Sequence, residues 1–163
     1  AGTLDWYSLD FWANKFDVDI IALKQDCSHK IGIRADALQF LQQLRRFDAK
    51  VYLATNAHPK TLELKFAYRD LAEYFDGIYS SADIGAPKED QAYWQRLQTQ
   101  TQFDSAHTVF FDDSEAVLDS AALYGIGQIV AITTPDSAKP AKTFGRHIEI
   151  DQFAELNLIN EVN

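Results

Sequence analysis

The stretch that decides the fold reads Thr108-Val-Phe-Phe-Asp-Asp-Ser-Glu-Ala-Val117. Its first half has strand-forming residues, which end in two adjacent carboxylates, Asp112 and Asp113. A helix is expected to open at Ser114, because apolar residues then recur at helical spacing as far as Gly125. The stretch therefore predicts a buried strand that carries two acidic side chains at its carboxyl end.

Two adjacent carboxylates require an explanation. Each anion raises the proton affinity of the other unless a cation lies between them. Oxygen ligands at the end of a strand suit Mg²⁺, which takes one or two carboxylates together with water and a substrate phosphate. The alternative is that Asp113 and Ser114 only cap the following helix, which accounts for one of the two carboxylates.

Length and composition exclude several classes of protein. The chain has 163 residues, of which 47% are hydrophobic, enough for a single buried core. No apolar run approaches the roughly 18 residues of a membrane span, and no signal peptide is recognised. The single cysteine, Cys27, excludes an internal disulfide and favours the cytoplasm. The net charge of −9 argues against nucleic acid or a membrane as partner, but allows a small phosphorylated metabolite.

Helical and strand-like segments alternate from about residue 34 onward, which predicts an α/β fold with a parallel sheet and helices on both faces. Asp36 is expected to cap the first helix of this part. The expected strands are Val51–Ala54, Ile78–Tyr79, Thr108–Phe111, Gln128–Ile132 and His147–Ile150, and further helices are expected over Pro59–Tyr68, Glu89–Gln98 and from Ser114.

The first 33 residues have a different character, because they are helical and rich in aromatic side chains. Trp6, Tyr7 and Trp12 have two interpretations. They form an aromatic core between short helices, or they line a pocket for a flat ligand. The residues alone leave both open.

Ligands of parallel α/β sheets bind beyond the carboxyl ends of the strands. Thr55, Asn56, Asp112 and Asp113 all follow expected strands, and Lys88 lies in a loop at the same edge. A hydroxyl and an ammonium suit phosphate oxygens, and carboxylates suit a divalent metal. Taken singly, Thr55 and Asn56 have a capping alternative, and Lys88 has the alternative of a solvated surface charge.

The order of these motifs resembles the haloacid dehalogenase (HAD) superfamily of phosphohydrolases. Its second, third and fourth motifs are similar to Val51-Tyr-Leu-Ala-Thr-Asn56, Gly85-Ala-Pro-Lys88 and Val109-Phe-Phe-Asp-Asp113. The chain is most similar to a bacterial branch of purine nucleotidases that act on GMP and IMP. The runs that carry this closer resemblance include Thr55-Asn-Ala-His-Pro59, Pro87-Lys-Glu-Asp-Gln91 and Asp112-Asp-Ser-Glu-Ala116.

The resemblance implies a role for each residue of the candidate site. Thr55 would bind the transferring phosphoryl group, and Asn56 would support its loop. Lys88 would neutralise the charge of the phosphate and the nucleophile. Asp113 would be the principal Mg²⁺ ligand, with Asp112 beside it. A metal pair argues against a true dehalogenase, whose chemistry needs no metal.

The resemblance also implies two domains. Residues 1–33, with Trp6, Tyr7 and Trp12, would be the remainder of a helical cap that closes over the site. Residues 34–163 would be the HAD-like core without its first strand. In the family that strand lies between the strands that end at Asn56 and Asp113, so we expect both to have an unpaired edge.

The first family motif, Asp-x-Asp-Gly-Thr, supplies the nucleophile and is not found. Ala1-Gly-Thr-Leu-Asp5 imitates only its end. We therefore expect the nucleophilic aspartate upstream of residue 1 and residues 1–163 alone to be inactive.

Two function classes follow. The first is a Mg²⁺-dependent phosphatase that works through an aspartyl-phosphate, with a purine nucleotide, phosphoglycolate or a sugar phosphate as substrate. The second is a non-catalytic binding or regulatory derivative of the fold. The aromatic residues favour a substrate with a base that stacks. The sequence leaves the oligomeric state open.

Overall fold

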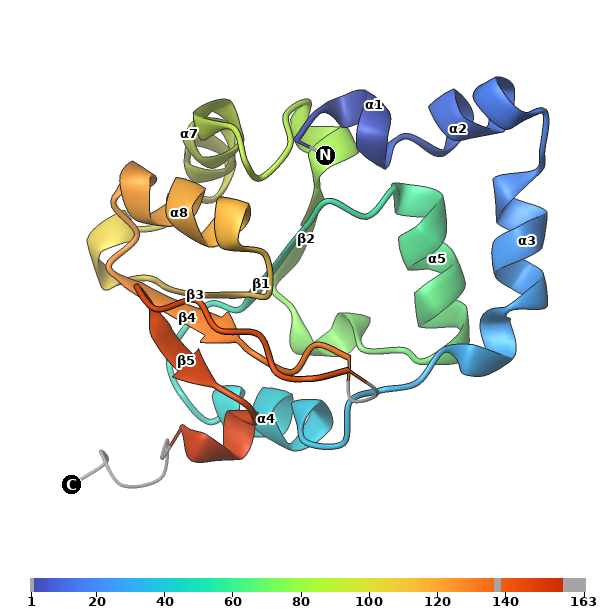
Figure 1. Ribbon diagram of the computed structural model, residues 1–163. Helices are drawn as coiled ribbons and strands as arrows, with labels where there is room; N and C mark the ends of the chain where they lie inside the picture. Colours follow the sequence, from blue (N-terminus) through green and yellow to red (C-terminus); the bar gives the residue numbers. More distant parts are fainter. Residues whose placement is uncertain (1, 137–138, 157–163) are drawn as a thin grey trace.

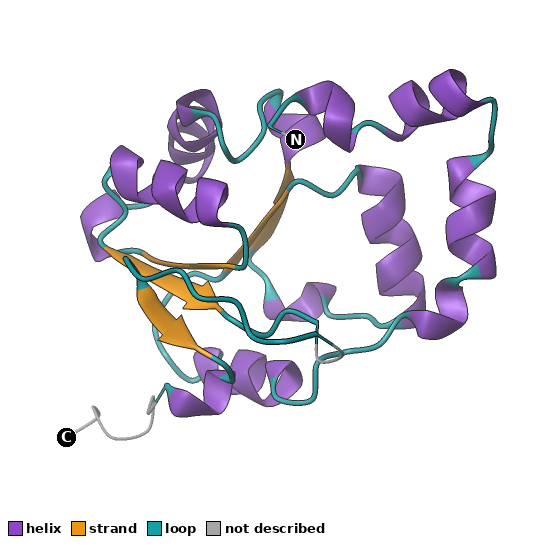
Figure 2. Ribbon diagram, viewed as in Figure 1, coloured by secondary structure: helices purple, strands orange, loops and turns teal. Residues whose placement is uncertain are grey.

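Parallel strands and surrounding helices make up the computed structural model, which describes residues 2–136 and 139–156 (Figures 1 and 2). The strands form two sheets. In the first, β1 (Tyr52–Thr55) pairs with β2 (Gly77–Ser80). In the second, β4 (Gln128–Ile132) lies between β3 (Val109–Asp112) and β5 (Ile148–Ile150). All pairings are parallel, as the alternating pattern predicts.

The central strand β4 shows why the register is well determined. Ile129 and Ala131 pack into the core under the helices α7 (Gln91–Thr101) and α8 (Glu115–Tyr124). Val130 and Ile132 lie on the opposite face with Ile150 of β5. Neighbouring residues of a strand point to opposite faces, so a slip of one residue would exchange the two sets. Each fully buried aliphatic side chain contributes about 1.5–3 kcal/mol, which opposes that slip.

The larger core lies between the sheets and helices α7 and α8 (Figure 1). Its largest side chains are Tyr93 and Trp94, which are almost completely buried. The Trp94 Nε1–H donates to the carbonyl of Lys88 and to the Ser120 hydroxyl, both at 3.0 Å. The Tyr93 hydroxyl donates to the carbonyl of Tyr79 at 3.0 Å, and burial raises its pKa above the ordinary range. These bonds hold the loop that contains Lys88 against the core.

The other face of the three-stranded sheet is covered by α4 (Ala37–Leu44). The Phe40 ring stacks on Phe153 with centroids 4.4 Å apart and meets Phe111 of β3 edge-on. Asp36 is the N-cap residue of this helix by position, as expected, but its side chain makes no capping bond. One of its oxygens instead pairs with Arg34 at 2.8 Å, and the other accepts the Phe153 N–H. The Asp36 side chain therefore makes contacts outside the helix that the local sequence pattern does not predict.

Element boundaries follow local signals closely. The expected helix from Pro59 to Tyr68 (α5) and the expected strand β4 have the observed bounds. The helix α7 begins at Gln91 and not at Glu89, because the Asp90 side chain accepts the Ala92 N–H as its N-cap. Glu89 therefore precedes the helix. The remaining short helices are α6 (Ser81–Ile84), η1 (Ser28–Lys30), η2 (Ala72–Tyr74), η3 (Ser105–His107) and η4 (Phe153–Glu155).

The amino-terminal helices arch away from the sheets (Figure 1). The arch consists of α1 (Leu4–Tyr7), α2 (Leu9–Phe16) and α3 (Ile20–Asp26). One end of the arch contacts α6 through α1, and the other contacts α5 through α3. Within the described residues, no helix combines the length and the apolar character needed to cross a membrane.

The edges of β1 and β3 that face each other are unpaired. Among the described residues, β1 pairs only with β2, and β3 pairs only with β4. This agrees with the expectation of two free edges in the middle of the sheet. Because β1 and β3 are not hydrogen-bonded to each other as strands, side chains connect the two sheets at this point.

Candidate active site

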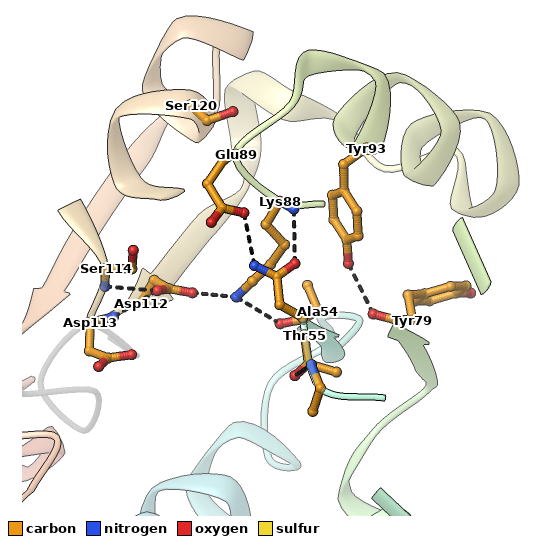
Figure 3. Close-up of polar contacts among 12 residues, drawn as sticks. Ala54, Thr55, Tyr79, Lys88, Glu89, Tyr93, Asp112, Asp113, Ser114 and Ser120 are labelled. Carbon is orange, nitrogen blue, oxygen red and sulfur yellow. Dashed lines mark hydrogen bonds and ion pairs between the residues drawn. The ribbon is translucent and has the colours of Figure 1, made fainter. Parts of the chain in front are cut away.

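Lys88 is the centre of the candidate site (Figure 3). It lies in the loop between α6 and α7 and is only 7% exposed. Its ammonium group donates to the carbonyl of Ala54 in β1 at 3.2 Å and to the carboxylate of Asp112 at the end of β3. Lys88 therefore joins the carboxyl ends of the two strands whose edges are free. The alternative of a solvated surface lysine is wrong for this residue.

Both oxygens of the Asp112 carboxylate are engaged by donors. One oxygen accepts from Lys88. The other accepts the backbone N–H groups of Asp113 and Ser114, each at 2.9 Å. These bonds order the turn between β3 and α8. The sequence suggested that Asp113 and Ser114 cap the start of α8, but Asp112 accepts the bonds. Ser114 is the N-cap residue by position, but its side chain makes no capping bond.

The side chain of Asp113 points away from Lys88 (Figure 3). Its carboxylate is 50% exposed and pairs with the ammonium of Lys142 at 3.3 Å. Lys142 also donates to the Asp113 carbonyl at 2.7 Å. The two adjacent carboxylates therefore have different surroundings, and a different lysine accompanies each. Lys142 lies in a loop without a motif, so the sequence offered no signal for it.

Thr55 and Asn56 end the first sheet at the same edge. The Thr55 hydroxyl accepts the Ala57 N–H at 3.0 Å, a local turn contact like the capping alternative. The side chain of Asn56 instead reaches across the loop, where its Oδ1 accepts the Lys88 N–H at 2.9 Å. Its Nδ2 donates to Glu89 at 2.9 Å. The structure thus brings Asn56, Lys88 and Asp112 into one hydrogen-bonded group.

Comparison with known proteins decides the family. A family model described as a haloacid dehalogenase-like hydrolase matches residues 8–125. The chain belongs to this HAD-like hydrolase family. Both the predicted family and the predicted α/β fold are therefore confirmed.

A curated relative supports the family, and solved structures support the fold. The GMP/IMP nucleotidase YrfG of Escherichia coli (strain K12) is 36% identical over 154 residues, which are 94% of this chain and 69% of the relative. A HAD phosphatase from Thermococcus onnurineus superposes with a TM-score of 0.78 at 24% identity, over 94% of this chain and 70% of that one. The HAD-hydrolase YfnB from Bacillus subtilis, bound to magnesium, has a TM-score of 0.64 at 22% identity, over 75% and 52%.

The sequence analysis did not predict the contact between Tyr7 and Glu89 at this HAD-like site. Glu89 accepts the Tyr7 hydroxyl at 2.5 Å on one oxygen and Asn56 on the other. Burial, the hydrogen bond to Glu89 and its negative charge together raise the pKa of Tyr7 to about 12. Tyr7 was expected near the site, but as a ring for stacking. Glu89 follows Lys88 directly, and its neighbour Asp90 made it resemble a solvated face.

The other two aromatic candidates pack mainly against their own neighbours. The Trp12 ring stacks on Phe16 with centroids 5.6 Å apart and meets Trp6 and Phe11 edge-on. Its Nε1–H donates to the Trp6 carbonyl at 2.7 Å. Trp6 remains 49% exposed. The rings therefore form an exposed aromatic cluster, and the role of Trp6 and Trp12 in binding stays a prediction.

Asp113 fits Mg²⁺ as part of a ligand set, whereas Asp112 already accepts from Lys88 and from two backbone N–H groups. Among the residues that the structure describes, no three His, Cys, Asp or Glu side chains are grouped as ligands of one ion. Asp113 has an exposed carboxylate, and Asp112 lies next to it in the chain. Mg²⁺ is commonly held by one or two carboxylates with water and phosphate as its other ligands. The residues present are therefore compatible with such an ion.

A separate surface hollow of about 590 Å³ lies at the opposite edge of the three-stranded sheet. Its lining comes from the amino ends of β3, β4 and β5 and includes Thr108, Gln128 and His147. Ligands of parallel sheets bind at the carboxyl ends, where Lys88 and Asp112 lie. The hollow is therefore not part of the candidate active site.

Proposed function

We propose that the protein is a Mg²⁺-dependent phosphatase that removes a phosphoryl group from a small metabolite, with a purine nucleotide as the favoured substrate. The observation that carries this proposal is the buried ammonium of Lys88, held between the Ala54 carbonyl and Asp112 at the carboxyl ends of β1 and β3. A preorganised cation in a site of low dielectric constant stabilises the developing charge of phosphoryl transfer.

Each remaining residue has a defined task in this proposal. Lys88 neutralises phosphate oxygens, and Asn56 orients Lys88 through its backbone N–H. The Thr55 hydroxyl accepts a bond from Ala57, so its own proton is available to a phosphate oxygen. Asp113 would be the principal residue that holds Mg²⁺, and Asp112 beside it holds Lys88 and the turn through its two oxygens. The ion would supply positive charge that reduces the repulsion between the phosphate and an attacking anion.

The proposed nucleophile is an aspartate on a segment that precedes residue 1. Its carboxylate oxygen would form a bond to phosphorus while the ester oxygen leaves and takes up a proton. Water would then cleave the aspartyl-phosphate to release inorganic phosphate and restore the carboxylate. The unpaired edges of β1 and β3 on either side of Lys88 leave a place where such a segment would bring its side chain to the phosphate.

The nucleotide substrate is supported by the relative named GMP/IMP nucleotidase, which is 36% identical over most of this chain. The exposed ring of Trp6 offers a surface on which a base can stack. Phosphoglycolate and sugar phosphates are the competing substrates within the same mechanism. A non-catalytic binding protein is the competing function class.

The test is a phosphate-release assay of the natural full-length protein with Mg²⁺ against GMP, IMP, phosphoglycolate and glucose 6-phosphate. We expect the highest kcat/KM with the purine nucleotides and loss of turnover when EDTA is added. Trp6→Ala should raise KM for GMP about threefold to tenfold, which corresponds to about 0.5–1.5 kcal/mol of stacking, and leave KM for glucose 6-phosphate unchanged. Absence of phosphate release from all four compounds would overturn the proposal.

A further inference from the structure

The carboxylate of Glu89 bonds two residues that are distant in the chain, one of them 82 residues away from Glu89 and the other 33. One oxygen accepts the hydroxyl of Tyr7 in α1 at 2.5 Å. The other accepts the side-chain amide of Asn56, just after β1, at 2.9 Å. Glu89 is half-buried, and among the described residues it forms no ion pair within 4.0 Å. Two neutral donors therefore hold this charge in place.

The contacts continue from Glu89 to the ammonium of Lys88. Asn56 receives the Lys88 N–H on its Oδ1 while its Nδ2 donates to Glu89, so the orientation of the amide depends on Glu89. On the other side, the Lys88 carbonyl accepts the Trp94 N–H at 3.0 Å. The backbone of Lys88 is thus held at both its N–H and its carbonyl. A change at Glu89 reaches Lys88 through one intermediate side chain.

We propose that Glu89 is a positioning residue that couples the seating of α1 to the placement of Lys88. The inference rests on the proposed phosphatase function and deepens it. When α1 is seated, the Tyr7 hydroxyl engages one oxygen of Glu89 and fixes the rotation of the carboxylate. The second oxygen then faces Asn56, whose amide in turn faces Lys88. The docking of the amino-terminal helices and the alignment of the catalytic lysine thereby become one event.

Tyr7 is suited to this task because it stays a hydrogen-bond donor. Its pKa is raised to about 12, first by burial and then by the hydrogen bond to Glu89. At neutral pH the hydroxyl therefore keeps its proton. A phenylalanine at this position would preserve the ring and remove only the bond to Glu89.

The kinetic test uses the full-length enzyme with Mg²⁺ and GMP. Tyr7→Phe should raise KM about threefold to tenfold and lower kcat about threefold, because weaker seating of α1 also loosens Glu89 and, through Asn56, the placement of Lys88. Glu89→Ala should lower kcat at least tenfold, because Asn56 loses its acceptor. Adding Tyr7→Phe to Glu89→Ala should change neither constant further. Independent, multiplying effects in the double variant would overturn the proposal.

Matched variants separate positioning from general stability. Tyr124→Phe is the control, because its hydroxyl also donates to a side-chain oxygen, Gln98 Oε1, at 2.6 Å, but is not one of the bonds that run from Tyr7 through Glu89 and Asn56 to Lys88. It should leave KM and kcat unchanged. Glu89→Gln keeps the length of the side chain and can still accept from Asn56 while donating to Tyr7. It should restore kcat to within about threefold of the wild type, and failure to do so would contradict a positioning role.

A readout without turnover distinguishes this inference from the proposed function. The titration of Tyr7 is followed by NMR of tyrosine labelled at Cζ, with Tyr7→Phe to assign the signal. In Glu89→Gln, the pKa of Tyr7 should fall from about 12 toward its ordinary value of 10.0. An unchanged pKa would overturn the coupling. A lowered pKa in a protein that releases no phosphate would establish the contact between Tyr7 and Glu89 and overturn the phosphatase function.

Discussion

The ammonium of Lys88 and the carboxylate of Asp112 form an ion pair that is almost completely shielded from solvent, with 9% and 8% of the two side chains exposed. The pair connects the end of β3 with the loop that packs on β1, although these strands share no ladder. The two groups are separated by 24 residues and meet because the loop after α6 returns to the edge of the sheet at which β3 ends. The contact therefore serves the stability of the fold and the proposed chemistry together.

Removing one partner of this pair should destabilise the protein strongly. Lys88→Met leaves the Asp112 carboxylate buried without its cation, for which we expect a loss of about 3–5 kcal/mol in the free energy of unfolding. The double variant Lys88→Met/Asp112→Asn should recover part of that loss, because the uncompensated charge is removed. Urea denaturation at neutral pH measures both. A double variant as unstable as the sum of the single variants would contradict the coupling.

The matched control is the exposed ion pair on the other carboxylate. Lys142 pairs with Asp113, and both side chains are about half exposed. Exposed pairs contribute about 0–1 kcal/mol, so Lys142→Met should change the free energy of unfolding by less than that. A large loss in this control would mean that any charge removal at this edge destabilises the protein.

Asp113→Asn should separate metal binding from folding. The side chain is half exposed, and within the described part of the chain its carboxylate pairs with Lys142, so its loss should leave the unfolding midpoint almost unchanged. Under the proposed function, affinity for Mg²⁺ should fall at least tenfold, since a direct ligand loses its charge. Isothermal titration with Mg²⁺ provides the readout without turnover. Unchanged Mg²⁺ affinity would refute Asp113 as the principal ligand.

Asp76 should make the start of the first sheet sensitive to acid. Its pKa is lowered from 3.8, first because the Val51 N–H donates to it at 2.9 Å and then because Lys50 lies nearby. A carboxyl whose pKa is depressed on folding stabilises the protein above its ordinary pKa, and that contribution is lost as the pH falls through the lowered pKa. The stabilisation by Asp76 is therefore present at neutral pH.

The comparison of wild type and Asp76→Asn across pH tests this sign. The variant should unfold at a lower temperature at about pH 7, and the difference should shrink as the pH falls through the lowered pKa and the wild-type carboxyl becomes protonated. Differential scanning calorimetry gives the unfolding temperatures. Asp104→Asn is a useful comparison, because the pKa of Asp104 is also lowered but its main partner is the neighbouring His107. A constant difference at every pH would exclude the assigned linkage.

Gly127 should not tolerate a side chain. A Cβ at this position would lie 2.0 Å from the carbonyl oxygen of Ala106, which belongs to the backbone and cannot rotate away. We expect Gly127→Ala to lower the free energy of unfolding by about 1–3 kcal/mol or more, as overpacking does. Gly32→Ala is the control, since no atom lies within 4 Å of its added Cβ. Equal stability of the two variants by urea denaturation would contradict the close approach.

Much of the architecture could be predicted because its signals are local. The turn residues around α5, the apolar run of β4 and the glycine that ends α8 lie next to the elements that they define. The convergence of Asn56, Lys88 and Asp112 was also predictable, because parallel strands deliver their carboxyl ends to one edge. The boundary at Glu89 was missed because Asp90 offered the better cap.

Local patterns in the sequence thus determined the elements, their order and the edge at which polar side chains gather. Tertiary structure alone decided which of those side chains pair with one another. Asp112 faces Lys88 while Asp113 turns to Lys142, a division that two identical neighbours in a sequence do not reveal. Likewise, Glu89 meets Tyr7 only because α1 folds back beside α6. The physical reason is range: helix and strand periodicity acts between neighbours, whereas these contacts depend on how distant elements pack.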